Sequence, residues 1–279
     1  MLTTLLRHKV RGIRAFTYAR FMESQSPLAV EDHGNVRVLR LNRPDKLNSF
    51  NGPLLYALND AVKKIKRDDS VHCFIITGTP RPDGRPCFSA GDDLEEAARG
   101  EGPTDNPGNK LTQLIDECLK PSIAVIDGIC TTGALEIAMS CDLRFVADTA
   151  SLSDWHLSRL GTGIGGWGAS TRLTKLVGLA QAKDMILTGK AIDGAEALRI
   201  GLAQRVFASA SLWDESMKIA QTIASMNPAG VKSTMMHMSH VEDMSKAEAL
   251  AFAKQVREAM PNSDKFQDKA TNVLKNKGS

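Results

Sequence analysis

The sequence lacks the features of membrane, disulfide-linked and zinc-binding proteins. No stretch approaches the roughly 18 to 20 consecutive apolar residues of a membrane helix, and the apolar run from Ile123 to Ile126 ends at Asp127 and Gly128. The five cysteines are odd in number and scattered, without a C-x-x-C pair, so neither a disulfide framework nor a zinc knuckle is indicated. We therefore expect a soluble protein of a reducing compartment.

An excess of charge of one sign is also lacking outside the N-terminus. The 279 residues include 35 Lys and Arg and 32 Asp and Glu, but residues 1–22 hold five of the basic side chains and no acid. The rest of the chain is slightly acidic, with 30 basic and 32 acidic residues. Binding to nucleic acid relies on clustered Lys and Arg, so no nucleic-acid partner is expected.

Residues 1–22 have the composition of a mitochondrial transit peptide. They are rich in Arg, free of Asp and Glu, and can place Leu2, Leu5, Leu6 and Ile13 on one side of a helix. This composition predicts import into the mitochondrial matrix. The alternatives are a disordered tail or a second start at Met22, and the fold is considered without this segment.

From residue 29 to residue 146, strand and helix patterns alternate. The apolar stretches predict strands at 29–41, 71–77, 123–126 and 143–146, and helices at 54–65, 110–119 and 134–139. Such alternation predicts an α/β fold with parallel pairing of strands. After residue 170 the patterns at 173–177, 180–187, 194–200, 213–226 and 246–260 all predict helices, so the last third should be mostly helical.

The first of three glycine-bearing turns is Cys87–Leu94, where a helix is expected to begin near Asp93. Free backbone N–H groups at a helix start can bind an anionic oxygen, while Asp93 can cap the helix. An ordinary capped turn is the alternative interpretation.

The second turn, Ile126–Met139, joins a strand to a helix that carries Glu136 among apolar residues. If Glu136 faces a cleft, partial burial would raise its pKa and suit it to proton transfer. If it only stabilises the first turn through the helix dipole, no chemistry follows. The spacing leaves both interpretations open.

The third turn, residues 161–168, formally satisfies G-x-G-x-x-G. A dinucleotide site needs a preceding strand and an acid at the end of the next strand, and both are missing here, so no nucleotide cofactor is expected. His237 and His240 lie three residues apart in a Met-rich stretch without a further ligand nearby. They indicate helix packing, and no metal site is expected.

Taken in order, these segments resemble the enoyl-CoA hydratase/isomerase (crotonase) family over about residues 28–275. The matching pieces are 41–49, 88–94, 127–133, Glu136, 141–142, 171–173, 187–189, 195–198 and 201–202. The resemblance implies a spiral of ββα turns at residues 23–205 that holds the acyl-CoA site. It also implies a helical trimerisation region at 206–279, and hence a homotrimer or hexamer.

The resemblance further implies an oxyanion hole and a coenzyme A surface. In the family, two backbone N–H groups hold the thioester oxygen of an acyl-CoA as it becomes an enolate, and by match they belong to Asp92 and Gly133. Glu136 matches an acid/base, and the residues implied to lie along coenzyme A are Lys46, Leu47, Ala90, Asp93 and Leu94. Coenzyme A is part of the substrate, and no separate cofactor is expected.

Departures from the family pattern leave the reaction open. A second glutamate belongs in the stretch 153–159, where Asp154 and His156 are instead the side chains able to move a proton. Asp92 stands where a small apolar residue is usual, and Thr132 replaces a glycine. Enoyl-CoA hydratase is the first hypothesis; an isomerase, decarboxylase or thioester hydrolase is the second, and a non-catalytic acyl-CoA-binding protein the third.

Overall fold

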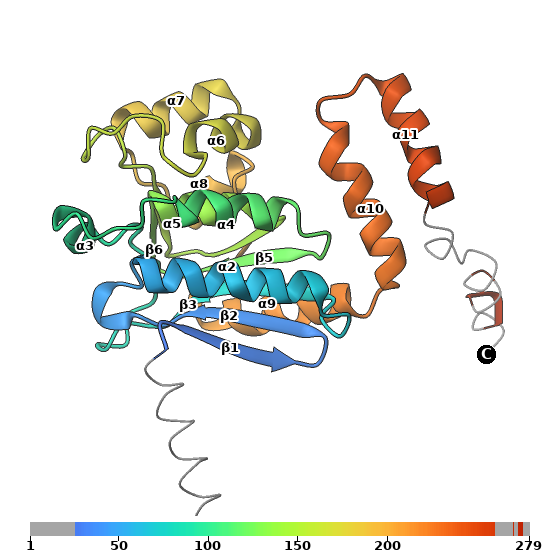
Figure 1. Cartoon of the computed structure of the whole chain (residues 1–279), viewed down its shortest axis with the longest axis horizontal. Helices are drawn as coiled ribbons and strands as arrows, with labels where there is room; N and C mark the ends of the chain where they lie inside the picture. Colours follow the sequence, from blue (N-terminus) through green and yellow to red (C-terminus); the bar gives the residue numbers. More distant parts are fainter. Residues whose placement is uncertain (1–25, 260–269, 271–272, 276–279) are drawn as a thin grey trace, which may run out of the picture.

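The computed structural model describes residues 26–259, 270 and 273–275, so the predicted transit peptide lies outside the described residues. The described part is built on a six-stranded sheet in the order β1-β2-β3-β5-β7-β9 and a three-stranded sheet in the order β4-β6-β8 (Figure 1). The strands of the large sheet are β1 (Leu28–His33), β2 (Val36–Leu41), β3 (Cys73–Gly78), β5 (Ser122–Ile126), β7 (Leu143–Ala147) and β9 (Arg205–Phe207). Those of the small sheet are β4 (Cys87–Ser89), β6 (Ile129–Thr131) and β8 (Ser151–Ser153). Apart from the antiparallel pair β1 and β2, the strand pairs within these two sheets are parallel, which confirms the predicted α/β class.

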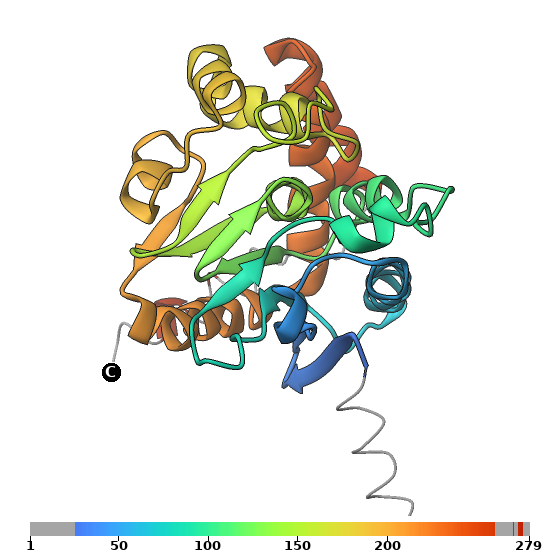
Figure 2. The same cartoon turned by 90° about the vertical axis from the view of Figure 1, so that its left-hand side faces the viewer.

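Helices cover both faces of the large sheet. The described helices are α2 (Gly52–Arg67), α3 (Leu94–Ala98), α4 (Pro107–Asp116), α5 (Gly133–Ser140), α6 (Ala169–Val177), α7 (Leu179–Thr188), α8 (Gly194–Arg199), α9 (Ser209–Ala224), α10 (Pro228–Val241) and α11 (Lys246–Ala259). Helix α9 packs against β2, β3, β5, β7 and β9 from below in Figure 2. On the other face α2 packs against α4, and α4 against α5. A 3-10 turn, Pro44–Lys46, precedes α2.

The sequence of α2 shows why these helices form where they do. The Asn51 side chain caps the helix by accepting a hydrogen bond from the Leu54 N–H, and a proline follows in the first turn. Apolar side chains at helical spacing, from Leu54 to Ile65, are buried against the sheet and α4. Basic residues in the last turn, ending at Arg67, complement the helix dipole.

Some predicted boundaries are wrong. The strand expected at 29–41 is a hairpin of β1 and β2, because Gly34 adopts φ +65° and reverses the chain between His33 and Val36. The strands β6, β8 and β9, each of three residues, were not predicted because such short segments show no clear alternation. The helix expected around His237 and His240 is α10, and its start at Pro228 is not predicted, although Asn227 and Pro228 provide an N-cap and a first-turn proline.

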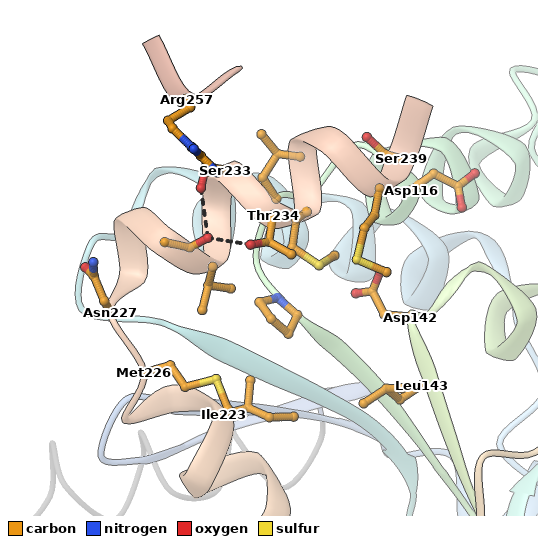
Figure 3. A pocket seen from close by; sticks show the side chains of 16 residues that line it. Asp116, Asp142, Leu143, Ile223, Met226, Asn227, Ser233, Thr234, Ser239 and Arg257 are labelled. Atoms are coloured by element: carbon orange, nitrogen blue, oxygen red, sulfur yellow. Dashed lines mark hydrogen bonds between the residues drawn. The ribbon is translucent and has the colours of Figure 1, made fainter. Parts of the chain in front are cut away.

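The last two described helices pack differently from the rest. Helix α10 has no buried residue and α11 buries Val256 alone, so both stand apart from the sheets in Figure 1. Between α10 and the body lies a groove of about 960 Å³, lined by Leu143, Ile223, Met226 and Met238 among others (Figure 3). Within the described part of the chain, no helix is both long and apolar enough to cross a bilayer.

Candidate active site

The turn between β4 and α3 is held by backbone pairing with Phe50. The Phe50 N–H donates to the Gly91 carbonyl (2.8 Å), and the Asp93 N–H donates to the Phe50 carbonyl (3.0 Å). The Asp93 carboxylate caps α3 by accepting from two helix N–H groups and pairs with Arg43 at 2.8 Å. Burial opposes the charge of Asp93, but Arg43 and the helix N–H groups outweigh it and keep its pKa below the usual value. The predicted capping role is confirmed.

The first and second glycine turns meet at the start of α5. Gly91 has φ +89°, and a Cβ on it would lie 3.3 Å from the Gly133 nitrogen and 2.8 Å from the Thr131 carbonyl oxygen. A side chain on Gly91 is therefore excluded, because the Thr132 hydroxyl and the backbone of the second turn already fill that space. Thr132 adopts φ +50°, in the left-handed region that glycine tolerates best, which gives a physical reason for the glycine usual there.

The backbone N–H groups of Asp92 and Gly133 border this junction. The first N–H groups of a helix have no partner within the helix, and Gly133 is the first residue of α5. Neither N–H donates to another backbone group or side chain among the described residues. The two turns thus bring together the pair of donors that the resemblance implies.

Glu136 lies one turn into α5 and is 1% exposed. Its Oε1 accepts hydrogen bonds from the Trp167 N–H (2.7 Å) and the Ala169 N–H (2.9 Å), both at the end of the third glycine turn. A Cβ on Gly165 would lie 2.7 Å from that oxygen, so the turn approaches Glu136 closely because it lacks a side chain there. The third turn therefore anchors a carboxylate by its backbone.

Asp154 and His156, which follow β8, meet Glu136 in the interior. His156 Nε2 lies 3.4 Å from Glu136 Oε2, and His156 Nδ1 lies 2.9 Å from Asp154 Oδ1. Burial disfavours the imidazolium, but the hydrogen bonds that the ring donates to Asp154 and Glu136 outweigh it and raise the pKa of His156 to about 10. The three side chains form a continuous chain in which a cation lies between two carboxylates.

Asp92 is the acid of this region that lacks a partner. Its side chain is open to the cleft and forms no hydrogen bond or ion pair with the residues that the structure describes. Protein atoms surround it closely enough that desolvation, followed by repulsion from Glu136, raises its pKa to about 6. A small apolar residue at this position would bring no such charge.

The residues implied to lie along coenzyme A occupy one side of the same turn. The Leu47 carbonyl accepts from the Ala90 N–H at 3.0 Å, which joins the segment before α2 to the end of β4. Lys46 Nζ lies 2.8 Å from Glu95 Oε2, and Leu94 is 57% exposed. Asp93 is engaged by Arg43, as described above. Lys46 and Leu94 are therefore exposed, whereas Asp93 is buried and held by its cap and ion pair.

Sequence reasoning missed Trp167, whose indole packs edge to face on Phe50 with ring centres 5.9 Å apart. The signal available was a large aromatic residue within a glycine-rich turn. His237 and His240 pack against Phe252, as expected of helix packing. Across the ranges that the structure describes, no group of three or more side chains is arranged to hold a metal ion.

A family model described as enoyl-CoA hydratase/isomerase matches residues 31–278. The chain belongs to the enoyl-CoA hydratase/isomerase family. A probable enoyl-CoA hydratase of Rhizobium meliloti is 32% identical over 257 residues, 91% of this chain and 97% of that protein. A short-chain-enoyl-CoA hydratase of Clostridium acetobutylicum is 33% identical and covers 80% of this chain and 85% of its own.

Solved structures agree with this assignment. The crystal structure of an enoyl-CoA hydratase from Bacillus anthracis superimposes with a TM-score of 0.81 at 28% identity, covering 90% of this chain and 96% of that one. The expected crotonase fold is confirmed, and the chain is an enzyme of the hydratase/isomerase family. In the stretch 153–159, where the resemblance implies a second glutamate, the structure brings His156 to Glu136.

Proposed function

We propose that this enzyme adds water to the double bond of a 2-enoyl-CoA thioester. The observation that carries the proposal is the buried chain Glu136–His156–Asp154 beside the unpaired N–H groups of Asp92 and Gly133. The N–H groups would hold the thioester oxygen as it becomes an enolate. Preorganised donors of this kind are each worth about 3 to 4 kcal/mol in the transition state.

The proton transfers follow from the positions of the side chains. Glu136 Oε1 is occupied by two backbone N–H groups, which leaves Oε2 to take a proton from water as its oxygen bonds to C3. Electrons of the double bond move to the thioester oxygen as the enolate forms, and they return to C2 as His156 Nε2–H protonates it. The proton on Glu136 Oε2 then passes to His156 Nε2, 3.4 Å away, which restores both groups. Asp154 holds the ring through Nδ1 and is in this scheme a positioning residue.

His156 can replace the missing glutamate without changing the charge of the site. Two glutamates that share one proton carry one negative charge, and so do two carboxylates paired with an imidazolium. The raised pKa of His156 keeps it protonated at neutral pH, which suits the role of proton donor. We therefore assign the second acid/base to His156.

The test follows loss of the conjugated absorbance of crotonyl-CoA by the full chain, with Glu136→Gln and His156→Gln in parallel. We expect rapid loss in the wild type and at least a 100-fold lower rate in each variant, the usual contribution of a general acid or base. A wild type that binds crotonyl-CoA without consuming it would contradict hydration.

Parallel assays with other thioesters separate the other hypotheses. A rise of conjugated absorbance from a 3-enoyl-CoA would indicate an isomerase, for which Glu136 alone could remove and return the proton. Release of carbon dioxide or of free coenzyme A would indicate a decarboxylase or a thioester hydrolase. Binding without any turnover would leave a non-catalytic acyl-CoA-binding protein. We propose no cofactor besides the coenzyme A of the substrate.

We also propose that the chain assembles into a homotrimer or hexamer through its last helices. The groove of Figure 3 is bordered by apolar side chains, and Met238 on α10 and Leu250 on α11 are 62% and 64% exposed. Exposed apolar surface of this extent is typical of interfaces. Light scattering should give the mass of three or six chains, and a monomer would contradict the proposal.

A mitochondrial location is proposed on two grounds. Residues 1–22 have the composition of a transit peptide, and a probable mitochondrial enoyl-CoA hydratase of Dictyostelium discoideum is 30% identical over 228 residues. A fluorescent fusion of the full chain should enter mitochondria, and a fusion without residues 1–22 should not. Equal distribution of the two fusions would contradict the proposal.

A further inference from the structure

A small cavity opens beside the proposed oxyanion hole. It has a volume of about 190 Å³, and its apolar wall is formed by Phe50, Leu55, Pro103, Pro107 and Trp167. Pockets for drug-sized ligands measure about 300 to 1,000 Å³, so this one suits an acyl group of only a few carbons. Asp92, whose N–H is the proposed donor to the thioester oxygen, borders the same cavity.

Trp167 is a fixed wall of this cavity. A Cβ on Gly108 or on Gly133 would collide with the indole, so the ring fills the space between α4 and α5. The Trp167 carbonyl accepts from Arg172 Nη1 at 2.9 Å and from Thr112 Oγ1 at 3.1 Å, while its N–H is held by Glu136. With both backbone groups bound and the residue 7% exposed, Trp167 is held in place at the wall of the cavity.

The carboxylates around the cavity are not equivalent. Asp93 is paired with Arg43 and caps α3, and Glu96 accepts from the Gly52 N–H at 3.0 Å. Asp92 has no such partner among the residues described. A bound acyl group would displace water from Asp92, and an unpaired carboxylate out of water is costly unless a hydrogen-bond donor replaces that water.

We propose that the cavity takes a short acyl group that carries a hydroxyl, which donates a hydrogen bond to Asp92. This inference deepens the proposed function, on which it rests, by naming its substrate class. An apolar acyl group of the same length would leave the Asp92 charge unpaired beside the developing enolate, where two negative charges repel. A hydroxyl that donates to Asp92 stabilises the carboxylate charge and so weakens its repulsion of the enolate.

The test measures binding of saturated thioesters, which have no double bond to hydrate, by titration calorimetry on the full chain. We expect 4-hydroxybutyryl-CoA to bind about 10- to 100-fold more tightly than butyryl-CoA, the range of a hydrogen bond to a charged group. Octanoyl-CoA should bind more weakly than butyryl-CoA. Equal affinity for the first two, or tightest binding of octanoyl-CoA, would overturn the inference.

Two pairs of variants locate the effect. Asp92→Ala removes the carboxylate but keeps the N–H, so it should abolish the preference for the hydroxyl, whereas Asp92→Asn keeps an acceptor oxygen and should retain part of it. Trp167→Ala should admit octanoyl-CoA, and Trp167→Phe, which keeps an aromatic wall, should not. A hydroxyl preference that survives Asp92→Ala would assign recognition to another group and contradict the inference.

The binding and turnover measurements can contradict the substrate class and the proposed hydration independently of each other. If crotonyl-CoA and 4-hydroxycrotonyl-CoA are both unchanged by the enzyme while the saturated hydroxyacyl thioester binds best, the proposed hydration is wrong and the substrate class stands. If crotonyl-CoA is hydrated faster than 4-hydroxycrotonyl-CoA and the hydroxyl brings no affinity, hydration stands and the substrate class is wrong.

Discussion

Two acids of the proposed active site, Glu136 and Asp92, lie in opposite surroundings. Glu136 is buried, with one oxygen held by two backbone N–H groups and the other facing His156. Asp92 is open to the cleft and has no hydrogen-bond partner among the described residues. The proposed role of Glu136 is proton transfer, which needs a group positioned in advance, and the proposed role of Asp92 is to receive a hydrogen bond from the ligand. On these proposals the Glu136 side of the site is fixed before the substrate binds, and the Asp92 side is completed by the substrate.

The largest effect on kcat should come from one methyl group placed against Glu136. Gly165→Ala would place a Cβ 2.6 Å from the Ala169 Cβ and 2.7 Å from Glu136 Oε1, so the start of α6 and the carboxylate must both shift. A displacement of about 1 Å at a catalytic group can cost about 100-fold, so we expect a loss of that order in kcat for crotonyl-CoA.

Gly163→Ala is the matched control for this change. Gly163 also has a positive φ, +85°, but a Cβ on it would meet no atom within 4 Å. It carries the same backbone strain without the contact, so its kcat should stay near the wild-type value. Equal losses in the two variants would show that strain in the loop, and not contact with Glu136, is responsible.

A smaller loss of kcat is expected when His156 loses the carboxylate that holds its ring. Asp154→Asn removes the charge at Nδ1, so kcat should fall about 10- to 100-fold, part of what a general acid contributes. Because Asp154 helps to raise the pKa of His156, the alkaline limb of the pH–rate profile should move to lower pH. A lower rate with an unmoved limb would mean that Asp154 has a structural role only.

The contribution of His156 to the free energy of unfolding should fall as the pH becomes alkaline. The pKa of His156 is about 10 in the folded protein and near 6.5 when unfolded, so the folded state holds the proton more tightly. Its stabilisation is complete below about pH 6.5 and is lost as the pH rises through about 10. Denaturant unfolding of the wild type and His156→Gln should therefore give free energies that converge over this window. A constant difference would contradict the assignment.

The smallest effect should come from replacing Asp92, and it should appear in the thermal stability. The pKa of Asp92 is raised to about 6, so ionisation of Asp92 costs stability as the pH rises from about 4 through 6. Asp92→Asn removes this cost, and we expect a Tm higher by a few degrees at pH 7.5 and unchanged at pH 4. A lower Tm at pH 7.5 would show that the carboxylate has a stabilising partner.

The sequence predicts the Glu136 side of the site better than the Asp92 side. Glu136 stands out because an acid among apolar neighbours is unusual, and Asp93 because its position before a helix is typical of a cap. The contact between His156 and Glu136 joins segments 20 residues apart through packing of β6 and β8, which are too short to show a pattern. Trp167 could not be assigned, because its role depends on space left at Gly108 and Gly133.

The way in which Trp167 holds Glu136 also bears on how this site can change over evolution. The anchor is a backbone N–H, which every residue except proline supplies, whereas the wall of the cavity is the side chain. A single codon change at position 167 can therefore resize the cavity while the anchor for the carboxylate remains. On the proposed roles, acyl-chain range and proton transfer are separable traits at this position, and new thioesters can be reached without loss of the chemistry.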